Sequence, residues 1–569
     1  MNRNVESHFA LTAGIDIQRS TFDRSQDVKF TFDVGQCIPF YVDECLPGDT
    51  HKITTSKVVR LQTLLTPVMD NIYLDTYYFF VPYRLVWQHW REFMGENTQS
   101  AWLPQVEYTI PQMRCYYYNT PDNIEMDMRV KPGDFADYMG VPVNVPLSKG
   151  TATSTADAVT AGEYFEFSAL PYRAYVLIWN EWFRDENLQD PKNFSTGDAN
   201  QRMPTGQERN GVEYVYRAGK YHDYFTSALP SPLKAAGPVL APIESSNSVG
   251  IPVGSKDTDH NFSTARMHLF SGSNKYLYSN QQFTSTNSNN YYAPILGNNS
   301  STDPNPLNLY GDVSSLGINI MSLRNAFQVQ KFLERDARAG TRYTEIIKGH
   351  FNVNSPDSRL QRPEYLGGNR IPISIHQITN QSQGENDFLG DLGAMSLTTD
   401  RNEDFTYSCT EHGVIIGICV ARYDHSYPQG LERFWSRKTR YDFYWPEFAH
   451  LSEMAILNQE IYAQGIKSDD EAVFGYQEAY GDYRYKPNRV AGEMRPGISN
   501  TLASWHFADN YVRLPTLSDA WIKENKTNVD RTLAVTSAVA NQCFADFYIQ
   551  NYTTRPMPVR SIPGLADHF

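Results

Sequence analysis

The hydrophobic pattern is densest in residues 72–81, where nearly every residue is β-branched or aromatic. Neither face of this run alternates cleanly to polar residues, so the pattern predicts a central strand that is buried on both sides. Proline has no backbone N–H for a strand ladder, so we expect the strand to stop at Pro82. The apolar and aromatic cluster that follows in residues 85–93 indicates a packed scaffold rather than a catalytic centre.

Further strand patterns gather near both ends of the chain. Apolar and polar residues alternate strictly in residues 28–34 and again in 38–42, which is the period of a half-buried strand. Additional strands are expected at 50–65, 371–378, 414–421 and 543–552. Composition and pattern together therefore predict a mainly β protein with helical insertions.

Helical spacing appears in three places. Residues 170–190 carry apolar side chains on one helical face, residues 321–339 do so more roughly, and Gly340 suits the C-terminal cap of the second helix. A third helix is expected to begin near Pro446 and to run to about residue 459, because proline is tolerated in a first turn. Residues 97–170 are rich in proline and tyrosine and are expected to be irregular.

The composition changes abruptly in residues 241–315, which hold 14 Ser, 11 Asn and 5 Thr. Such a segment cannot build a core of its own, so we expect it on an exposed surface. A disordered linker is the alternative. The rings in this segment favour some order: Tyr276, Tyr278, Phe283, Tyr291 and Tyr292.

The whole chain is acidic and aromatic. Its formal net charge of -14 argues against a protein that grips nucleic acid over its entire surface, although a local basic face is still allowed. The 37 Tyr, 30 Phe and 9 Trp favour β structure, and they suit large interfaces as well as an aromatic core. The longest clean apolar run, residues 414–421, is too short to cross a bilayer, and no signal peptide is recognised, so no membrane insertion is expected.

No motif for catalysis or for a metal is present in the sequence. The chain lacks H-E-x-x-H, G-x-S-x-G, a Walker A loop and G-x-G-x-x-G, so we expect no enzyme activity, no catalytic residue and no cofactor. The six cysteines include no C-x-x-C pair, so they are expected to be reduced buried thiols without a metal. Dispersed carboxylates of a glycosidase have no fixed spacing and stay possible.

The strongest candidate for nucleic-acid contact is the segment 433–441, where four cations alternate with three rings. Cations neutralise phosphates and rings stack on unpaired bases, so such contacts would be independent of base sequence and would weaken with salt. An inter-subunit patch, or a surface strand with ion pairs, is the favoured alternative. The candidate contacts to single-stranded nucleic acid, including two in the C-terminal tail, are Arg433, Trp435, Arg437, Lys438, Arg440, Arg555 and Arg560.

Several segments together resemble one family. They include F-F-V-P (79–82), R-L-V-W (84–87), F-M-G-E (93–96) and W-N-E-W-F-R-D-E-N-L-Q (179–189). They look like the major capsid protein of gokushoviruses, which are small icosahedral phages of the microvirus family with circular single-stranded DNA. The likeness runs from about residue 20 to the end and lapses in 241–315, where this family carries a variable insertion that projects from the shell.

The resemblance implies a single viral jelly-roll β-barrel with long helix- and loop-containing insertions. Strand patterns at both ends of the chain fit this fold, because the first and last strands of a jelly roll lie side by side. The expected divisions are an N-terminal arm (1–20), a first part of the jelly roll with helical insertions (21–240), the Ser/Asn-rich outward protrusion (241–315), and a second part with helical insertions and the C-terminal tail (316–569).

The function that the resemblance implies is that of a structural major capsid protein in the virion, assembled in the cytoplasm of a host bacterium. Many copies would form an icosahedral shell of the T=1 type around circular single-stranded DNA. The resemblance also implies that the insertion contributes to host attachment, with these rings as candidates for its host-facing surface: Tyr276, Tyr278, Phe283, Tyr291 and Tyr292. The implied partners are other copies of the chain, single-stranded DNA, a small basic internal DNA-binding protein, a transient internal scaffolding protein and a host cell-surface receptor. A sugar-binding jelly-roll adhesin and a polysaccharide hydrolase are the alternatives.

Overall fold

The computed structural model of the chain describes residues 18–97, 107–119, 125–152, 159–160, 163–203, 215–235, 239, 243–245, 253–255, 267–269, 277–284, 290–294, 309–311, 316–318, 320–381 and 389–560. The chain forms two compact units. Unit 1 comprises Met1–Pro232 and Ala339–Phe569, and unit 2 comprises Leu233–Arg338. Of the expected N-terminal arm, residues 1–17 lie outside the described residues.

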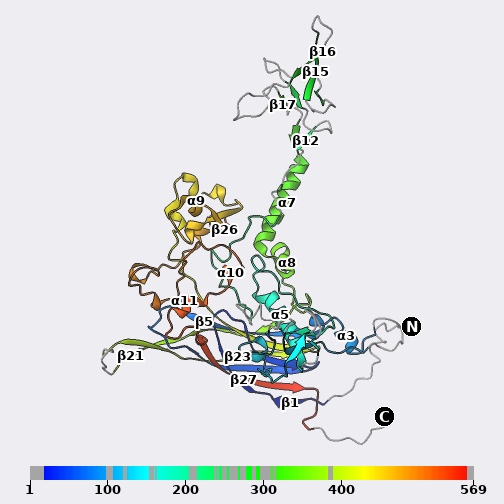
Figure 1. The fold of residues 1–569 in the computed structure, drawn as a ribbon, viewed down its shortest axis with the longest axis vertical. Coiled ribbons are helices and arrows are strands. Elements are labelled where there is room, and N and C mark those ends of the chain that lie inside the picture. The colour runs from blue at the N-terminus through cyan, green and yellow to red at the C-terminus, as the bar shows by residue number, and fades with distance from the viewer. Residues whose placement is uncertain are drawn as a thin grey trace, which may run out of the picture. The chain divides into compact units, whose positions relative to one another are not determined.

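The first sheet of unit 1 joins the two ends of the chain (Figure 1). Its strands are β1 (Ser20–Asp23) and β2 (Gln26–Phe32), which both pair with β27 (Cys543–Arg555), followed by β4 (Thr50–Leu61) and β23 (Thr398–Ser408). All the pairings are antiparallel, and Gln26 of β2 lies opposite Ile549 of β27. The expected strands near residues 28, 50 and 543 are confirmed.

The second sheet is built around β5 (Ile72–Pro82), the predicted central strand. On one side β5 pairs with β24 (Gly413–Tyr423), which in turn pairs with β3 (Ile38–Cys45). On the other side it pairs with β19 (Glu364–Gly367) and β20 (Arg370–Ile373). From β2 to β5, and again from β20 through β23 and β24 to β27, the strands of these two sheets alternate between them, and β27 lies beside β1, so the jelly-roll prediction is confirmed.

The core between the two sheets is aromatic. The ring centroid of Phe40 on β3 lies 5.0 Å from that of Phe547 on β27 and 5.6 Å from that of Tyr78 on β5. All three side chains are buried, and edge-to-face ring pairs of this kind add stability beyond the area that they bury. The aromatic residues of the sequence therefore serve the core as well as the surface.

Residues 97–170 are more regular than expected. The described part holds β6 (Gln112–Asn119), β7 (Glu125–Asp127), β8 (Gly150–Ala152), β9 (Val159–Thr160), β10 (Tyr164–Ser168) and the short helix α4 (Phe135–Tyr138). Together with β11 (Gln201–Arg202), these strands form a third sheet, in which β6 pairs with β7, β8, β10 and β11, and β8 also pairs with β9. The prediction failed because most of these strands are too short to produce a visible period.

Of the predicted helices, the one at 170–190 is shorter than expected and the one after Pro446 is absent. The helix expected at 170–190 is α5 (Leu170–Ile178), which continues as one π-helical turn, Trp179–Phe183, and then ends. The prediction of a helix after Pro446 is wrong. In this range only the 3-10 turns Pro446–Phe448 and Asn458–Glu460 are helical, and Glu453–Leu457 between them forms β25, which pairs with β26 (Val473–Glu478). Pairing with a distant strand overrode the local propensity.

The strand expected at 371–378 is divided into β20 and β21 (Ile375–Thr379), and β21 pairs with β22 (Leu392–Ser396). The remaining helical elements of unit 1 are short: α2 (Tyr83–Val86), α3 (Trp90–Phe93), α8 (Tyr343–Phe351), α9 (Lys467–Asp470), α10 (Asp519–Ile522), α11 (Lys526–Asp530), and the 3-10 turns Arg433–Ser436, Arg440–Asp442, Asn458–Glu460, Gly481–Tyr483, Gly492–Met494 and Ala503–Trp505. No described helix combines the length and the apolar character that a membrane crossing requires.

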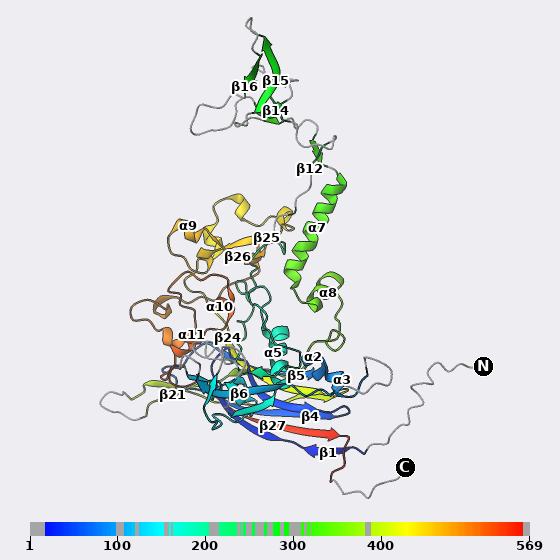
Figure 2. The same ribbon diagram turned by 45° about the vertical axis from the view of Figure 1, so that its right-hand side comes forward.

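Unit 2 contains nested strand pairs (Figure 2). The pair β12 (Ile243–Ser245) and β18 (Leu316–Ile318) flanks the pair β13 (Val253–Ser255) and β17 (Leu309–Gly311) in sequence. Between them lies a sheet of β14 (Met267–Leu269), β15 (Leu277–Thr284) and β16 (Asn290–Pro294). The predicted helix follows as α7 (Ile320–Ala339), and Gly340, with a φ of +100°, ends it as expected.

Candidate interaction surface

The segment 433–445 exposes an unusual number of rings. It contains two 3-10 turns, Arg433–Ser436 and Arg440–Asp442, connected by extended residues. Six side chains of this segment are between 42% and 67% exposed: Phe434, Trp435, Tyr441, Phe443, Tyr444 and Trp445. We refer to these six residues as the aromatic surface. Exposed rings that gather on one segment favour an interaction site.

Two of the predicted DNA contacts hold this segment in place. The Nη1 atom of Arg433 donates to the carbonyl of Ala455 at 2.8 Å and lies 3.4 Å from Oε1 of Glu460. Arg437 forms an ion pair with Asp482, and its guanidinium stacks 4.3 Å from the ring centroid of Tyr483. Both arginines therefore fix the aromatic surface to the neighbouring chain segments.

The other two cations of the segment are exposed. The Nζ atom of Lys438 lies 4.0 Å from Oε1 of Glu471, and both side chains are largely exposed. The guanidinium of Arg440 lies 4.7 Å from the ring centroid of Tyr441. Exposed ion pairs contribute little to stability, so Lys438 and Arg440 stay available to a partner, whether phosphate or carboxylate.

A groove of about 550 Å³ adjoins the aromatic surface. Its lining includes six cations (Arg433, Arg437, Arg484, Lys486, Arg489 and Arg495) and three carboxylates (Glu432, Glu460 and Asp482). The formal charge of the lining is therefore positive, whereas the net charge of the whole chain is negative. Burial raises the pKa of Glu460 to about 7, although Arg433 opposes the shift. The groove thus becomes more positive when Glu460 is protonated.

The remaining predicted contacts lie elsewhere in the chain. On β27, the Nε atom of Arg555 lies 3.0 Å from Oδ2 of Asp49, and its Nη2 atom donates to the carbonyl of Glu44 at 2.6 Å. Arg560 is exposed at the end of the described residues. Five of the seven predicted DNA contacts thus lie on the segment 433–440, as in the sequence, whereas Arg555 holds the turn that contains Asp49.

The predicted host-facing rings lie in unit 2. Tyr278 and Phe283 belong to β15, and Tyr291 and Tyr292 belong to β16. In the antiparallel register Phe283 lies opposite Tyr291. Tyr276 lies outside the described residues.

One buried charged cluster had no signal in the sequence. Nδ1 of His425 lies 3.0 Å from Oδ1 of Asp509, and its Nε2 lies 2.7 Å from Oε1 of Glu524. Lys220 approaches Asp509 at 3.8 Å. Although acid–histidine contacts of this kind occur in active sites, all four side chains are almost fully buried, so substrate has no access and the cluster is structural.

Comparison with known proteins agrees with this fold. Residues 11–565 match the family model described as "Capsid protein (F protein)". The chain is 38% identical to "Capsid protein VP1" of Chlamydia phage 1, over 99% of this chain and 98% of the relative. It is 36% identical to the protein of the same name from Bdellovibrio phage phiMH2K (100% and 99%) and 34% identical to that of Spiroplasma virus 4 (99% and 98%). The resemblance predicted from the motifs is thereby confirmed, and the chain belongs to the capsid protein (F protein) family.

Proposed function

We propose that many copies of this chain assemble into an icosahedral shell of the T=1 type that encloses circular single-stranded DNA. The chain is a structural capsid protein and a component of the virion, and its likeness over its whole length to three phage capsid proteins carries the proposal. Membership of this family favours a structural role over the sugar-binding and hydrolase alternatives.

Self-association is supported by apolar side chains that a single chain leaves exposed. The aromatic surface is one such area. Helix α7 presents another, with more than half of each of the side chains Ile320, Met321, Phe327 and Phe332 exposed. Rings supply large contact area at small entropic cost, so these areas suit interfaces between identical subunits.

Genome contact needs basic groups that the acidic chain supplies only locally. Lys438 and Arg440 are the cations of the segment 433–441 that are free to meet phosphate, whereas Arg433 and Arg437 are held by Glu460 and Asp482. With a net charge of -14 per chain, the shell would require additional positive charge inside. A small basic DNA-binding protein would supply it, and a scaffolding protein would assist assembly transiently.

The Ser/Asn-rich segment 241–315 is proposed to face outward and to contact a receptor on the host cell. Its small polar residues cannot form a core, which suits an exposed position. The nested strand pairs β12–β18 and β13–β17 would present the sheet of β15 and β16 as a discrete module.

Assembly is tested by co-expressing the full chain with its scaffolding protein and imaging the products by electron microscopy. Uniform closed shells are expected from the unaltered chain. The double variant Trp435→Ala/Tyr444→Ala should reduce the yield of shells at least tenfold while leaving the circular dichroism of the subunit unchanged. Val512→Ala, which alters an exposed apolar residue outside the aromatic surface, is the control. Normal shells from the double variant would remove the aromatic surface from the interface, and discrete small oligomers from the unaltered chain would contradict the shell itself.

The insertion and the DNA contact require separate tests. Replacing residues 245–310 with a short Gly/Ser linker should leave shell yield intact and abolish adsorption to host cells; loss of shells would make the segment structural instead. Lys438→Ala/Arg440→Ala should lower the affinity of the subunit for single-stranded DNA and reduce its salt dependence, as a phosphate contact requires. Equal binding by the double variant and the unaltered chain would assign these cations to a protein interface.

A further inference from the structure

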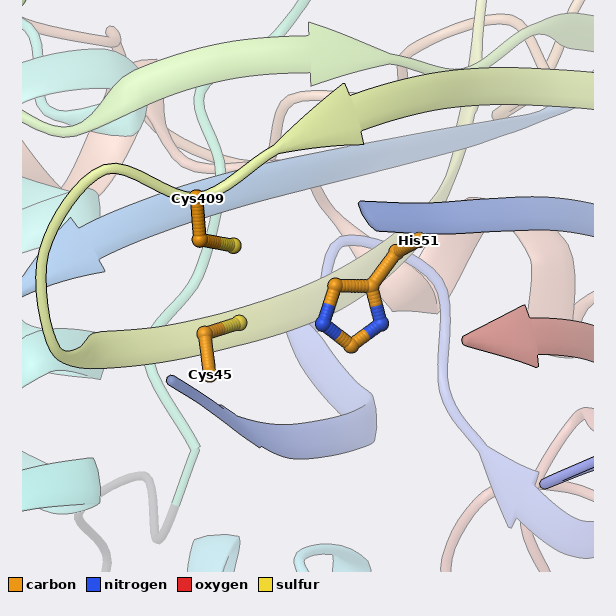
Figure 3. A group of neighbouring side chains, drawn as sticks. All are labelled: Cys45, His51 and Cys409. Atoms are coloured by element: carbon orange, nitrogen blue, oxygen red, sulfur yellow. The ribbon is translucent and has the colours of Figure 1, made fainter. Parts of the chain in front are cut away.

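Two cysteines and one histidine converge at one end of the barrel (Figure 3). Cys45 ends β3, His51 lies near the start of β4, and Cys409 follows β23. One ligand atom from each of the three buried residues lies within 4.8 Å of the other two. Figure 3 shows both sulfurs and one ring nitrogen of His51 turned toward a common point.

The backbone holds this arrangement in place. The turn between β3 and β4 is joined to Cys409 by two hydrogen bonds, from the N–H of Gly48 to the carbonyl of Cys409 and from the N–H of Cys409 to the carbonyl of Asp49, both at 2.8 Å. The three side chains therefore sit on ordered backbone rather than on a loose loop. Preformed ligands of this kind reduce the cost of ordering a site.

A hydrogen-bond chain sets the tautomer of His51. The hydroxyl of Thr553 donates to Oδ1 of Asn551 at 2.9 Å, so its oxygen can accept from Nδ1 of His51 at 3.1 Å. Nδ1 then carries the proton, and Nε2 keeps its lone pair. The Nε2 atom is fully buried and makes no hydrogen bond of ordinary geometry among the described residues, and the Cys409 thiol is a polar group that interacts with the ring. A buried acceptor left unpaired is costly, and a bound cation would satisfy it.

We propose that Cys45, His51 and Cys409 form a structural site for a thiophilic divalent cation, with Zn²⁺ as the best match. Two thiolates and a neutral imidazole are ligands that zinc prefers, and together with Zn²⁺ they form a neutral group, which lowers the cost of burial. Around a tetrahedral zinc ion with bonds of about 2.3 Å, ligand atoms lie roughly 3.5–3.8 Å apart, which agrees with the spacing limit of this cluster.

Asp49 lies beside the cluster but outside the 4.8 Å group, so its side chain would have to move to supply the fourth ligand. Its Oδ2 lies 3.7 Å from Nε2 of His51 and 3.0 Å from Nε of Arg555, whereas its Oδ1 is buried without a hydrogen-bond partner among the described residues. Arg555 would neutralise the additional negative charge of this carboxylate. The cation would cross-link β3 of one sheet to β4 of the other and clamp the turn before β24, so its role would be structural.

The test uses the full-length chain, kept reduced, freed of metal with a chelator and then titrated with Co²⁺. We expect a single Co²⁺ to bind per chain, with the thiolate-to-cobalt absorption of a tetrahedral site, and Zn²⁺ to displace it. Cys45→Ser and Cys409→Ser should each lose most of that absorption, whereas Cys115→Ser, which alters a buried thiol outside the cluster, should keep it.

A second measurement requires no variant and so does not depend on whether the cysteine variants fold. Zn²⁺ should protect Cys45 and Cys409 of the unaltered chain from alkylation during partial unfolding, and it should leave the labelling of Cys115 unchanged. Absence of thiolate–cobalt absorption in the folded chain would overturn the proposal. Peptide mapping that finds a disulfide between Cys45 and Cys409 in shells that contain no zinc would overturn it as well.

Discussion

Replacing His425 with glutamine should remove a pH-dependent part of the stability of this capsid protein. Burial alone would lower the pKa of His425, but Glu524 and Asp509 outweigh burial and the opposing charge of Lys220, and they raise the pKa to about 9. The charged form of the ring is therefore held between two carboxylates. Glutamine can keep one hydrogen bond to them but cannot carry the charge.

The sign of the effect follows from the direction of this shift. Because the pKa in the folded chain lies above the ordinary value of 6.5, the native state binds the proton more tightly than the unfolded chain does. The stabilisation is fully present below pH 6.5 and is lost as the pH rises through 9. The difference between these two pKa values corresponds to about 3 kcal/mol of unfolding free energy.

The assay is urea unfolding of unassembled subunits at several pH values between 6.5 and about 9.5, followed by tryptophan fluorescence and circular dichroism. The unaltered chain should lose about 3 kcal/mol more than His425→Gln over this range. Titrating groups outside the cluster contribute equally to both proteins and cancel in the comparison. His376→Gln, which alters an exposed histidine, should behave like the unaltered chain. Identical pH dependence of the His425 variant and the unaltered chain would refute the reasoning.

Three further substitutions test the barrel, each by urea unfolding with circular dichroism. Asp75→Asn should lower the free energy of unfolding by about 3–5 kcal/mol, because Asp75 is buried and its replacement leaves the mostly buried guanidinium of Arg422 without a counter-charge. A decrease of less than about 1 kcal/mol would contradict this role. Ile549→Ala, on the buried face of β27, should lower the free energy of unfolding by about 2–5 kcal/mol, because it leaves a cavity. An almost unchanged free energy of unfolding would place this side chain outside the core. Gly368→Ala should destabilise by more than the few tenths of a kcal/mol of an ordinary surface change, because Gly368 has a φ of +145° and an added Cβ would meet the backbone carbonyl of Thr76; unchanged stability would show that the backbone shifts freely there.

Strands with strong local patterns could be predicted from the sequence. Strand β5 is apolar on both faces because one face packs against the barrel core and rings such as that of Phe183 cover the other. The ring centroid of Phe183 lies 5.3 Å from that of Tyr77. The alternation in β2 follows from one buried face and one exposed face. The pairing of β2 with β27 could not be read from periodicity, and the family resemblance supplied it.

Features that depend on distant partners could not be predicted. The helix expected after Pro446 gave way to β25 because Glu453–Leu457 pairs with β26. The Cys45–His51–Cys409 cluster has no compact motif, because the fold brings Cys409 to the other two residues from more than 350 positions away. The charges of the segment 433–441 were visible in the sequence, but the partners that occupy Arg433 and Arg437 were not.

The position of β27 makes completion of the first sheet depend on a strand that is synthesised long after β1, β2 and β4. Strands β1 and β2 both pair with β27, and β4 has β23 on one side and β27 on the other. Until β27 has left the ribosome, β1 and β2 therefore lack their neighbour, and β4 keeps an unsatisfied edge. A chain truncated before β27 lacks the strand that closes this sheet, so we expect such chains to be unable to enter a particle.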